Sequence, residues 1–196
     1  MTQAVIVSTA RTPLAKSWKG AFNMTHGATL GGHAIKHAIA RAGIDPAEIE
    51  DAIMGCANPE GATGWDIARQ AALRAGMPVS VSGMTVNRFC SSGLQTVALA
   101  AQRILTGEAE CYVAGGVESI TGLDRGTPGT WEEHPRLMAD LPAIFMPMGN
   151  TAEVVARRYN VTREMQDVYS VQSQQRYAAA VEKGLVADEI APMNVK

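Results

Sequence analysis

The sequence predicts a layered α/β fold in which helices pack on a sheet. Hydrophobic residues make up 46% of the 196 residues, aromatic residues only 5%, and the first 116 residues alternate short strands with helices. Alternating strands and helices are typical of α/β layers, whereas this balance of residues suits an aromatic-rich all-β sandwich less well. The high apolar fraction excludes a globally disordered chain.

Two different periodicities predict the first strand and the first helix. Gln3–Ser8 is an apolar, β-branched run, which is typical of a short buried strand. From Thr29 onward, apolar side chains at helical spacing fall on one face, and Gly43 is well suited to end that helix. A short helical turn is expected next, because Pro46 directly follows Asp45.

Three more strands and two more helices are expected before residue 116. The strands are short apolar runs, and the helices are amphipathic segments that glycine closes. In chain order they are a strand at Asp51–Ala57, a helix at Trp65–Ala75, a strand at Met84–Asn87, a helix that runs to Thr106 and a strand at Glu110–Ala114. This order of elements indicates an α/β core.

The sequence pattern changes after about residue 120. Thr121–Phe145 is rich in Gly and Pro and shows little periodicity, which predicts an excursion out of the core. Helical patterns return at Thr151–Tyr159 and between residues 162 and 183. We therefore expect two parts, a core part at 1–119 and a second part at 120–196.

Charge and cysteine content exclude several classes of protein. The chain has 17 basic and 19 acidic residues, so a basic surface that binds nucleic acid is not expected. The three cysteines include no CxxC pair, which argues against a zinc site or a dithiol redox site. No apolar run reaches 18 residues, and the N-terminus lacks the pattern of a signal peptide. We therefore expect no membrane span and a reducing, cytoplasmic location.

Cys90 lies in the most informative stretch, Asn87–Gln95, where a predicted strand ends and a predicted helix begins. Unpaired N–H groups at a helix start stabilise a thiolate and can receive the oxyanion of an attacked acyl group. Ser91, Ser92 and Gly93 are small and leave room for a substrate. The pattern predicts a nucleophile, and its alternative is a buried cysteine that behaves as a small hydrophobic residue.

The other cysteines and two of the histidines have simpler interpretations. Cys56 and Cys111 lie in or beside apolar strands and are expected in the core. His33 and His37 are one helical turn apart, which suits either a metal site or a solvated helix face. No third ligand accompanies them, so we expect no metal site. No histidine is an evident base for Cys90, although a thiol nucleophile usually needs a base or a cationic neighbour.

The stretch around Cys90 resembles the acyl-accepting cysteine motif of thiolases. Four other segments resemble thiolases as well: Val5–Pro13, Ala68–Ala72, Ala114–Ser119 and Met148–Glu153. The resemblance runs along the whole chain, and the chain is identified as the N-terminal half of a thiolase-family protein. It implies a thiolase-like layered α/β/α/β/α core, of which residues 1–119 form the first half. Residues 120–196 would then be part of an inserted loop domain, and the C-terminal half is absent from this chain.

The resemblance also implies a reaction, acyl transfer between coenzyme A thioesters. Cys90 would hold the acyl group as a thioester, and its backbone N–H would help to bind the oxyanion. The reaction is thiolytic cleavage of a 3-oxoacyl-CoA or the reverse Claisen condensation. Coenzyme A thioesters are substrates, no metal or other cofactor is implied, and a homodimer or homotetramer is expected. The family's GHP and CxGGG motifs, which carry a histidine and a second cysteine, do not occur in this sequence.

Pro147-Met148-Gly149 bears on the choice of substrate. Many biosynthetic acetoacetyl-CoA thiolases have His-Met-Gly here, and the Pro form resembles degradative 3-oxoacyl-CoA thiolases, which accept longer acyl chains. Met148 would then line the acyl pocket, and its alternative is an ordinary core methionine. Three rival functions stay open: an acetoacetyl-CoA thiolase, a non-catalytic CoA- or lipid-binding subunit, and a ketosynthase-like condensing enzyme.

Overall fold

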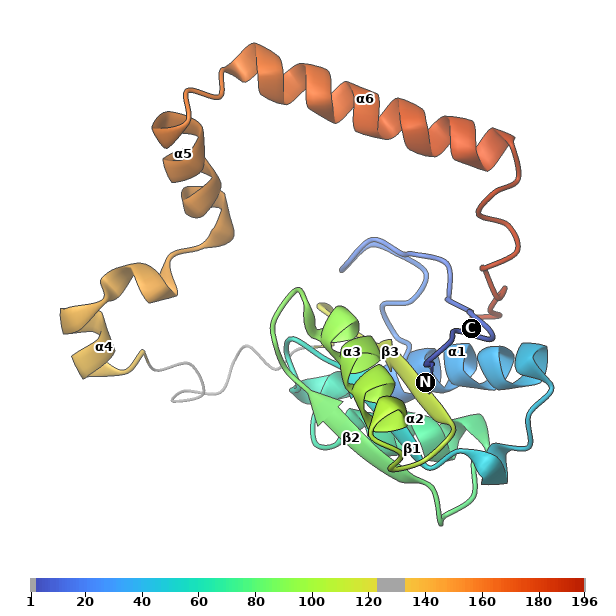
Figure 1. The fold of residues 1–196 in the computed structure, drawn as a ribbon. Coiled ribbons are helices and arrows are strands. Elements are labelled where there is room, and N and C mark those ends of the chain that lie inside the picture. The colour runs from blue at the N-terminus through green and yellow to red at the C-terminus, as the bar shows by residue number, and fades with distance from the viewer. Residues whose placement is uncertain (1–2, 123–132, 196) are drawn as a thin grey trace. The chain divides into compact units, whose positions relative to one another are not determined.

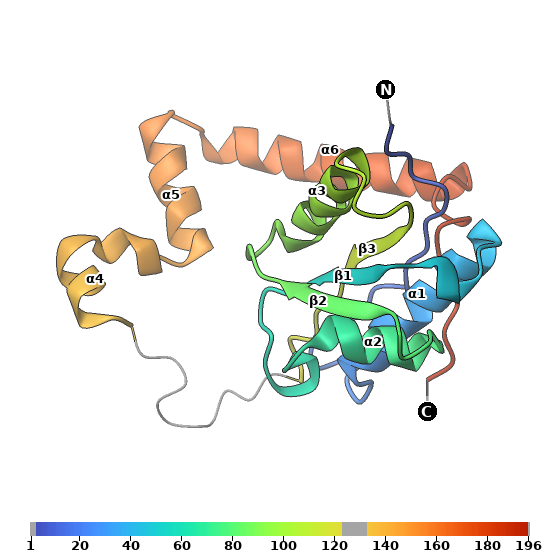
Figure 2. The same cartoon turned by 60° about the horizontal axis from the view of Figure 1, so that its bottom comes forward.

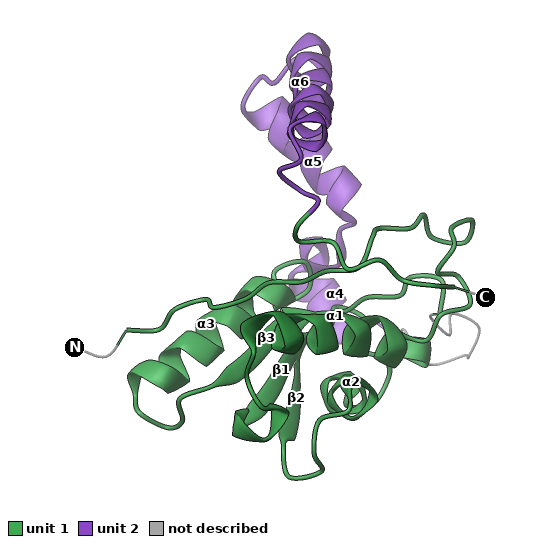
Figure 3. Ribbon diagram, turned by 90° about the vertical axis from the view of Figure 1, so that its right-hand side faces the viewer, with its two compact units in different colours: residues 1–124, 188–196 green, residues 125–187 purple. Residues whose placement is uncertain are grey.

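The computed structural model describes residues 3–122 and 133–195 (Figure 1). Contacts divide the chain into two compact units, residues 1–124 with 188–196 and residues 125–187 (Figure 3). We refer to them as unit 1 and unit 2. Part of the predicted excursion at Thr121–Phe145 lies outside the described residues.

A parallel sheet of three strands forms the centre of unit 1, with the order β2-β1-β3. Its strands are β1 (Asp51–Gly55), β2 (Ser82–Val86) and β3 (Tyr112–Gly116). All five residues of β1 are buried, because β1 has a strand on each side and helices on both faces. The predicted α/β fold is therefore confirmed, and the three strands lie within two or three residues of the predicted positions.

Helices cover both faces of the sheet (Figure 2). α1 (Gly27–Ala42) and α2 (Ile67–Ala75) lie on one face, and α3 (Ser92–Leu105) lies on the other. The strand order explains this arrangement: the chain moves outward from β1 to β2 and then back past β1 to β3. Both crossovers between parallel strands are expected to be right-handed, and they run in opposite directions across the sheet. Their helices, α2 and α3, therefore lie on opposite faces. Two single turns of 3-10 helix, η1 (Pro46–Glu48) and η2 (Gly61–Thr63), lie in the connections.

The two faces of β1 meet different partners. Met54 belongs to the core that the sheet shares with α1 and α2, and its side chain lies near Gly31 of α1. On the other face, a side chain at Gly55 would collide with Ser92 of α3. Ile53 is fully buried, and burial of such a side chain contributes roughly 2–3 kcal/mol.

The predicted strand at Gln3–Ser8 is wrong. These residues form no strand, and Val5, Ile6 and Val7 are 69%, 74% and 68% exposed. A cavity of about 490 Å³ is lined by residues 4–10 and by apolar side chains of α1, α3 and β3. The β-branched run has the composition of a strand, but a strand also needs a neighbour that accepts its backbone hydrogen bonds. The segment gains one bridge only at its end, where Arg11 pairs with Ile190.

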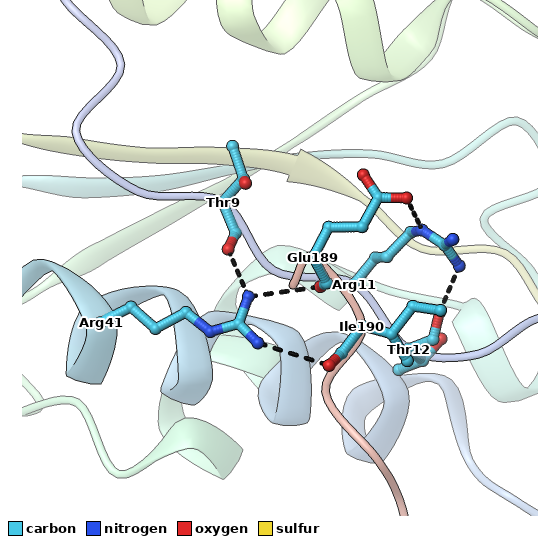
Figure 4. A network of polar contacts seen from close by, with 6 residues as sticks. All are labelled: Thr9, Arg11, Thr12, Arg41, Glu189 and Ile190. Carbon is cyan, nitrogen blue, oxygen red and sulfur yellow. Dashed lines mark hydrogen bonds and ion pairs between the residues drawn. The ribbon is translucent and has the colours of Figure 1, made fainter. Parts of the chain in front are cut away.

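Residues 188–191 are held in unit 1 by a polar network around Arg41 (Figure 4). The guanidinium of Arg41 donates to the carbonyl oxygens of Thr9 at 2.7 Å, Glu189 at 3.3 Å and Ile190 at 3.4 Å. Arg11 forms an ion pair with the Glu189 carboxylate at 2.7 Å. These residues are far apart in sequence, so helical or strand periodicity gives no sign of the network. The sequence predicts one part at 120–196, whereas the contacts join residues 188–196 to unit 1.

Unit 2 contains helices whose described residues are all at least partly exposed. They are α4 (Pro135–Asp140), the 3-10 turn η3 (Pro142–Phe145), α5 (Met148–Arg158) and α6 (Arg163–Glu182). The predicted helices at 151–159 and 162–183 are confirmed, although α5 begins three residues earlier. The six residues of α4 are too few to show a repeating helical pattern, so the sequence did not predict this helix. No helix within 3–122 and 133–195 is long and apolar enough to cross a membrane.

Candidate active site

Cys90 lies in the turn between β2 and α3, at the carboxyl end of the parallel sheet. β2 ends at Val86 and α3 begins at Ser92, so the predicted strand–turn–helix arrangement is confirmed. The Cys90 side chain is exposed. The alternative that Cys90 is a core residue is therefore wrong.

The turn before Cys90 has a left-handed residue. Phe89 has a φ of 46°, a conformation that costs a non-glycine residue about 1–2 kcal/mol. The Phe89 N–H donates to Asn87 Oδ1 at 2.9 Å, and the Phe89 carbonyl accepts from Ser92 Oγ at 2.6 Å. Ser92 Oγ also accepts from the Arg88 N–H at 2.8 Å. Side chains on both sides of Cys90 therefore stabilise this turn.

The start of α3 has no side-chain cap. Ser91 occupies the cap position but makes no capping hydrogen bond, because its Oγ donates to the Arg88 carbonyl at 2.9 Å. N–H groups in the first turn of a helix lack partners within the helix, and they carry its positive dipole end. This end can stabilise a negative charge on the sulfur of Cys90 or on an oxyanion next to it.

Gly55 lets α3 begin close to the sheet. A Cβ atom on Gly55 would lie 2.5 Å from the backbone carbon of Ser92, which real Cβ atoms do not tolerate. Gly116 also lies next to α3, but a Cβ atom there would lie 3.7 Å from the Cα atom of Gly93, which is an ordinary contact distance. Deeper along the helix, Thr96 Oγ1 donates to the Gly115 carbonyl at 2.9 Å. The ends of β1 and β3 thus support the start of α3.

Polar side chains connect the loops that follow all three strands. The Glu118 carboxylate, after β3, accepts from the N–H groups of Ala57 at 2.8 Å and Asn58 at 3.2 Å, which follow β1. Asn87, after β2, donates from Nδ2 to the Ala57 carbonyl at 3.1 Å. These roles of Glu118 and Asn87 were not predicted from the sequence. The available signal is that both are polar residues near the end of a predicted strand, since Asn87 is the last residue of Met84–Asn87 and Glu118 lies four residues after Glu110–Ala114.

The other two cysteines differ from Cys90. Cys56 is 1% exposed, as predicted for a core residue, and its Sγ lies 3.7 Å from Glu118 Oε1. Burial, and then the charge of Glu118, raise the pKa of the Cys56 thiol. Cys111 is half-buried, and burial followed by the charge of Glu48 raises its pKa. Both therefore stay protonated to higher pH than a free thiol does.

His33 and His37, the histidines one helical turn apart in α1, lie next to each other. The rings of His33 and His37 have centroids 4.4 Å apart, and His33 Nε2 lies 3.3 Å from the Ala191 carbonyl oxygen. Burial, followed by the charge of His33, lowers the pKa of His37. In the described parts of the chain, no group of three or more His, Cys, Asp and Glu side chains could hold a metal ion.

Met148, the predicted acyl-pocket residue, belongs to unit 2. It is the first residue of α5, directly after the cap residue Pro147, and its side chain is 69% exposed. The alternative of an ordinary core methionine is therefore wrong for unit 2 taken by itself. The assignment of Met148 to an acyl pocket stays a prediction.

Comparison with known proteins agrees with this fold and shows the family of the chain. The profile of the family described as "Thiolase, N-terminal domain" matches residues 4–196. The chain is 42% identical to a protein named "3-ketoacyl-CoA thiolase" from Bacillus subtilis (strain 168), over 100% of this chain and 50% of that protein. It is 40% identical to one named "Acetyl-CoA acetyltransferase" from Escherichia coli (strain K12), over 100% of this chain and 52% of that protein.

The chain therefore carries an α/β domain with a cysteine at a strand–helix turn, and it belongs to the thiolase family through the N-terminal domain of that family. This confirms the resemblance found in the sequence. The chain spans about half the length of the curated relatives that it matches.

Proposed function

We propose that the protein transfers acyl groups between coenzyme A thioesters, with Cys90 as the residue that holds the acyl group. The observation that carries this proposal is the exposed Cys90 thiol beside the uncapped start of α3, in a chain of the thiolase family. Two relatives carry the names "3-ketoacyl-CoA thiolase" and "Acetyl-CoA acetyltransferase". Both names describe acyl transfer to or from coenzyme A.

The proposed step forms one carbon–sulfur bond and breaks another. The Cys90 thiolate adds to the carbonyl carbon of acetyl-CoA, and the oxyanion faces the N–H of Cys90 and the start of α3. Collapse of this intermediate breaks the bond to the sulfur of coenzyme A, which leaves as a thiolate and takes up a proton. The acetyl group remains on Cys90 as a thioester, and a second acceptor then removes it.

Thiolytic cleavage of a 3-oxoacyl-CoA is the preferred form of the reaction. Pro147-Met148-Gly149 supports a longer acyl chain, and Met148 would line the acyl pocket. A biosynthetic acetoacetyl-CoA thiolase is the second candidate, because one relative bears the name of an acetyltransferase. Comparing the rates of thiolysis for short and long 3-oxoacyl-CoA substrates distinguishes the two. The proposal includes a homodimer or homotetramer in the cytoplasm, without a metal or redox cofactor.

A mass-spectrometric experiment tests the role of Cys90. The full-length protein is incubated with acetyl-CoA, digested under acidic conditions, and each cysteine peptide is examined for an acetyl group. We expect the acetyl group on Cys90 and none on Cys56 or Cys111, because burial raises the pKa of both of those thiols. Cys90→Ala should abolish acetylation, and Cys111→Ala is the matched control that should retain it. A protein that binds acetyl-CoA but gains no acetyl group would be the non-catalytic subunit instead.

A further inference from the structure

We propose that Asn87 is a positioning residue for Cys90. In this proposal, Asn87 holds the left-handed turn that directs the Cys90 thiol toward the start of α3. The role rests on Cys90 being the acyl-accepting nucleophile. Asn87 follows β2, and its side chain makes one hydrogen bond inside the turn and one to a neighbouring loop. It is exposed, so packing in the core does not account for these contacts.

The bond inside the turn acts on the residue directly before Cys90. Asn87 Oδ1 accepts from the Phe89 N–H at 2.9 Å, and Phe89 has the left-handed φ of 46°. That conformation is disfavoured for a phenylalanine. The Phe89 side chain is 75% exposed, so burial of its ring does not compensate for the cost. Ser92 Oγ binds the Phe89 carbonyl, whereas the Asn87 side chain binds the Phe89 N–H, so Asn87 stabilises the turn from the side of β2.

The second bond fixes Asn87 to the rest of the site. Asn87 Nδ2 donates to the Ala57 carbonyl at 3.1 Å, while the Ala57 N–H donates to the Glu118 carboxylate at 2.8 Å. The loops after β1 and β3 thus determine where Asn87 lies, and Asn87 determines the backbone before Cys90. Without Asn87, Phe89 can relax to a negative φ, which changes the direction of the backbone that carries Cys90.

The readout is the pH dependence of Cys90 alkylation in the full-length protein. The rate constant for iodoacetamide is measured by peptide mapping from mildly acidic to alkaline pH. Accessibility of the thiol changes the rate at every pH, whereas its placement beside the α3 N–H groups changes the midpoint of the profile. We expect Asn87→Ala to move the midpoint to higher pH and to lower the rate at neutral pH about three- to tenfold, the range that loss of one hydrogen bond corresponds to.

Two rescue variants separate positioning from a general loss of structure. A serine oxygen can also accept from the N–H two residues onward, so Asn87→Ser should restore most of the wild-type midpoint although it cannot reach Ala57. Glycine adopts a positive φ without steric cost, so Phe89→Gly combined with Asn87→Ala should also restore part of it.

Asp45→Ala is the matched control. Asp45 Oδ1 accepts from the Ala47 N–H at 2.9 Å, the same type of bond at the same length, before η1 and outside the site. It should leave the midpoint unchanged.

An unchanged midpoint in folded Asn87→Ala would overturn the proposal, as would an equal shift in Asp45→Ala. If Asn87→Ala does not fold, Asn87→Ser is compared with Asn87→Val, whose side chain offers no acceptor. A midpoint near the wild type in Asn87→Ser and a higher one in Asn87→Val support the proposal, and equal midpoints overturn it. Acetylation of wild-type Cys90 by acetyl-CoA is recorded in parallel. Its absence would refute the proposed function. An unchanged midpoint in folded Asn87→Ala, with wild-type Cys90 still acetylated, would refute the positioning role alone.

Discussion

Unit 1 and unit 2 both contain α-helices, but the helices of the two units differ in what stabilises them. In unit 1, α1 and α2 bury apolar side chains against the sheet, and Ile35, Ile67 and Ala71 are almost fully buried. In unit 2, no described residue of α4, α5 or α6 is buried. The 20-residue α6 exposes apolar side chains such as Val168 and Tyr169.

This difference shows that a helical pattern and a packed helix are separate properties. Helices in unit 2 contain local stabilising features, such as the Thr162 cap of α6 and the i,i+4 ion pair between Arg163 and Asp167 at 2.8 Å. Such features contribute roughly 1 kcal/mol or less each, whereas packing supplies most of the stability of protein helices. We therefore expect unit 1 to respond most to changes in packing and unit 2 to changes in local features.

The largest effect is expected at Gly55, where the sheet meets α3. In Gly55→Ala, the new Cβ atom would lie 2.5 Å from backbone carbon of Ser92, so either β1 or the start of α3 has to move. We expect a loss of about 3 kcal/mol in the free energy of unfolding, measured in urea. Gly93→Ala is the control, because a Cβ atom there meets nothing within 4 Å. Equal losses in both variants would show that contact with the sheet is not what makes Gly55 necessary.

A buried ion pair should give the next largest effect. Arg103 Nη1 lies 2.7 Å from Asp51 Oδ2, and the Asp51 side chain is only 7% exposed. Arg103→Leu leaves this carboxylate buried without its cation, which should lower the free energy of unfolding by about 2 kcal/mol. Arg163→Leu removes the exposed ion pair of unit 2 and should cost no more than about 0.5 kcal/mol. A larger loss of stability for Arg163→Leu than for Arg103→Leu would contradict the expectation that the ion pair of unit 1 contributes more than that of unit 2.

Local signals in the sequence were sufficient for most of the fold. Gly43 and Gly76 end α1 and α2 with φ values of 67° and 90°, as expected for glycines after amphipathic helices. The turn that carries Cys90 was also predictable from neighbouring residues, because a strand, a run of small residues and a helix follow one another directly.

Contacts between distant segments were not predictable from one sequence. Gln3–Ser8 has the composition of a strand, but no strand among the described residues pairs with it along its length. Arg41 binds carbonyl oxygens of residues 9, 189 and 190, and main-chain oxygens have no residue type that a pattern could reveal. Asn87 and Glu118 both form hydrogen bonds with the main chain of Ala57. These contacts were not predictable either, because each of the three residues follows a different strand.

A smaller effect is expected at the cap of α6. Thr162 Oγ1 accepts from the Met165 N–H at 3.3 Å, and Thr162→Ala should destabilise the helix by about 1 kcal/mol. Amide hydrogen exchange should become faster within α6 and stay unchanged in β1. Thr162→Ser keeps an acceptor oxygen and should exchange like the wild type. Faster exchange in β1 as well would indicate that the stability of unit 1 depends on α6.

The smallest effect is expected at Val168, on the exposed surface of α6. The side chain is 69% exposed, so Val168→Ser should change the free energy of unfolding by no more than about 0.5 kcal/mol. Val117→Ser is the matched variant in unit 1, where the valine is 8% exposed in the core, and it should cost at least about 2 kcal/mol. A loss of similar size at Val168 would mean that the surface of α6 is covered in the full-length protein. The contrast between the units would then reflect a missing partner surface rather than a difference in how their helices are built.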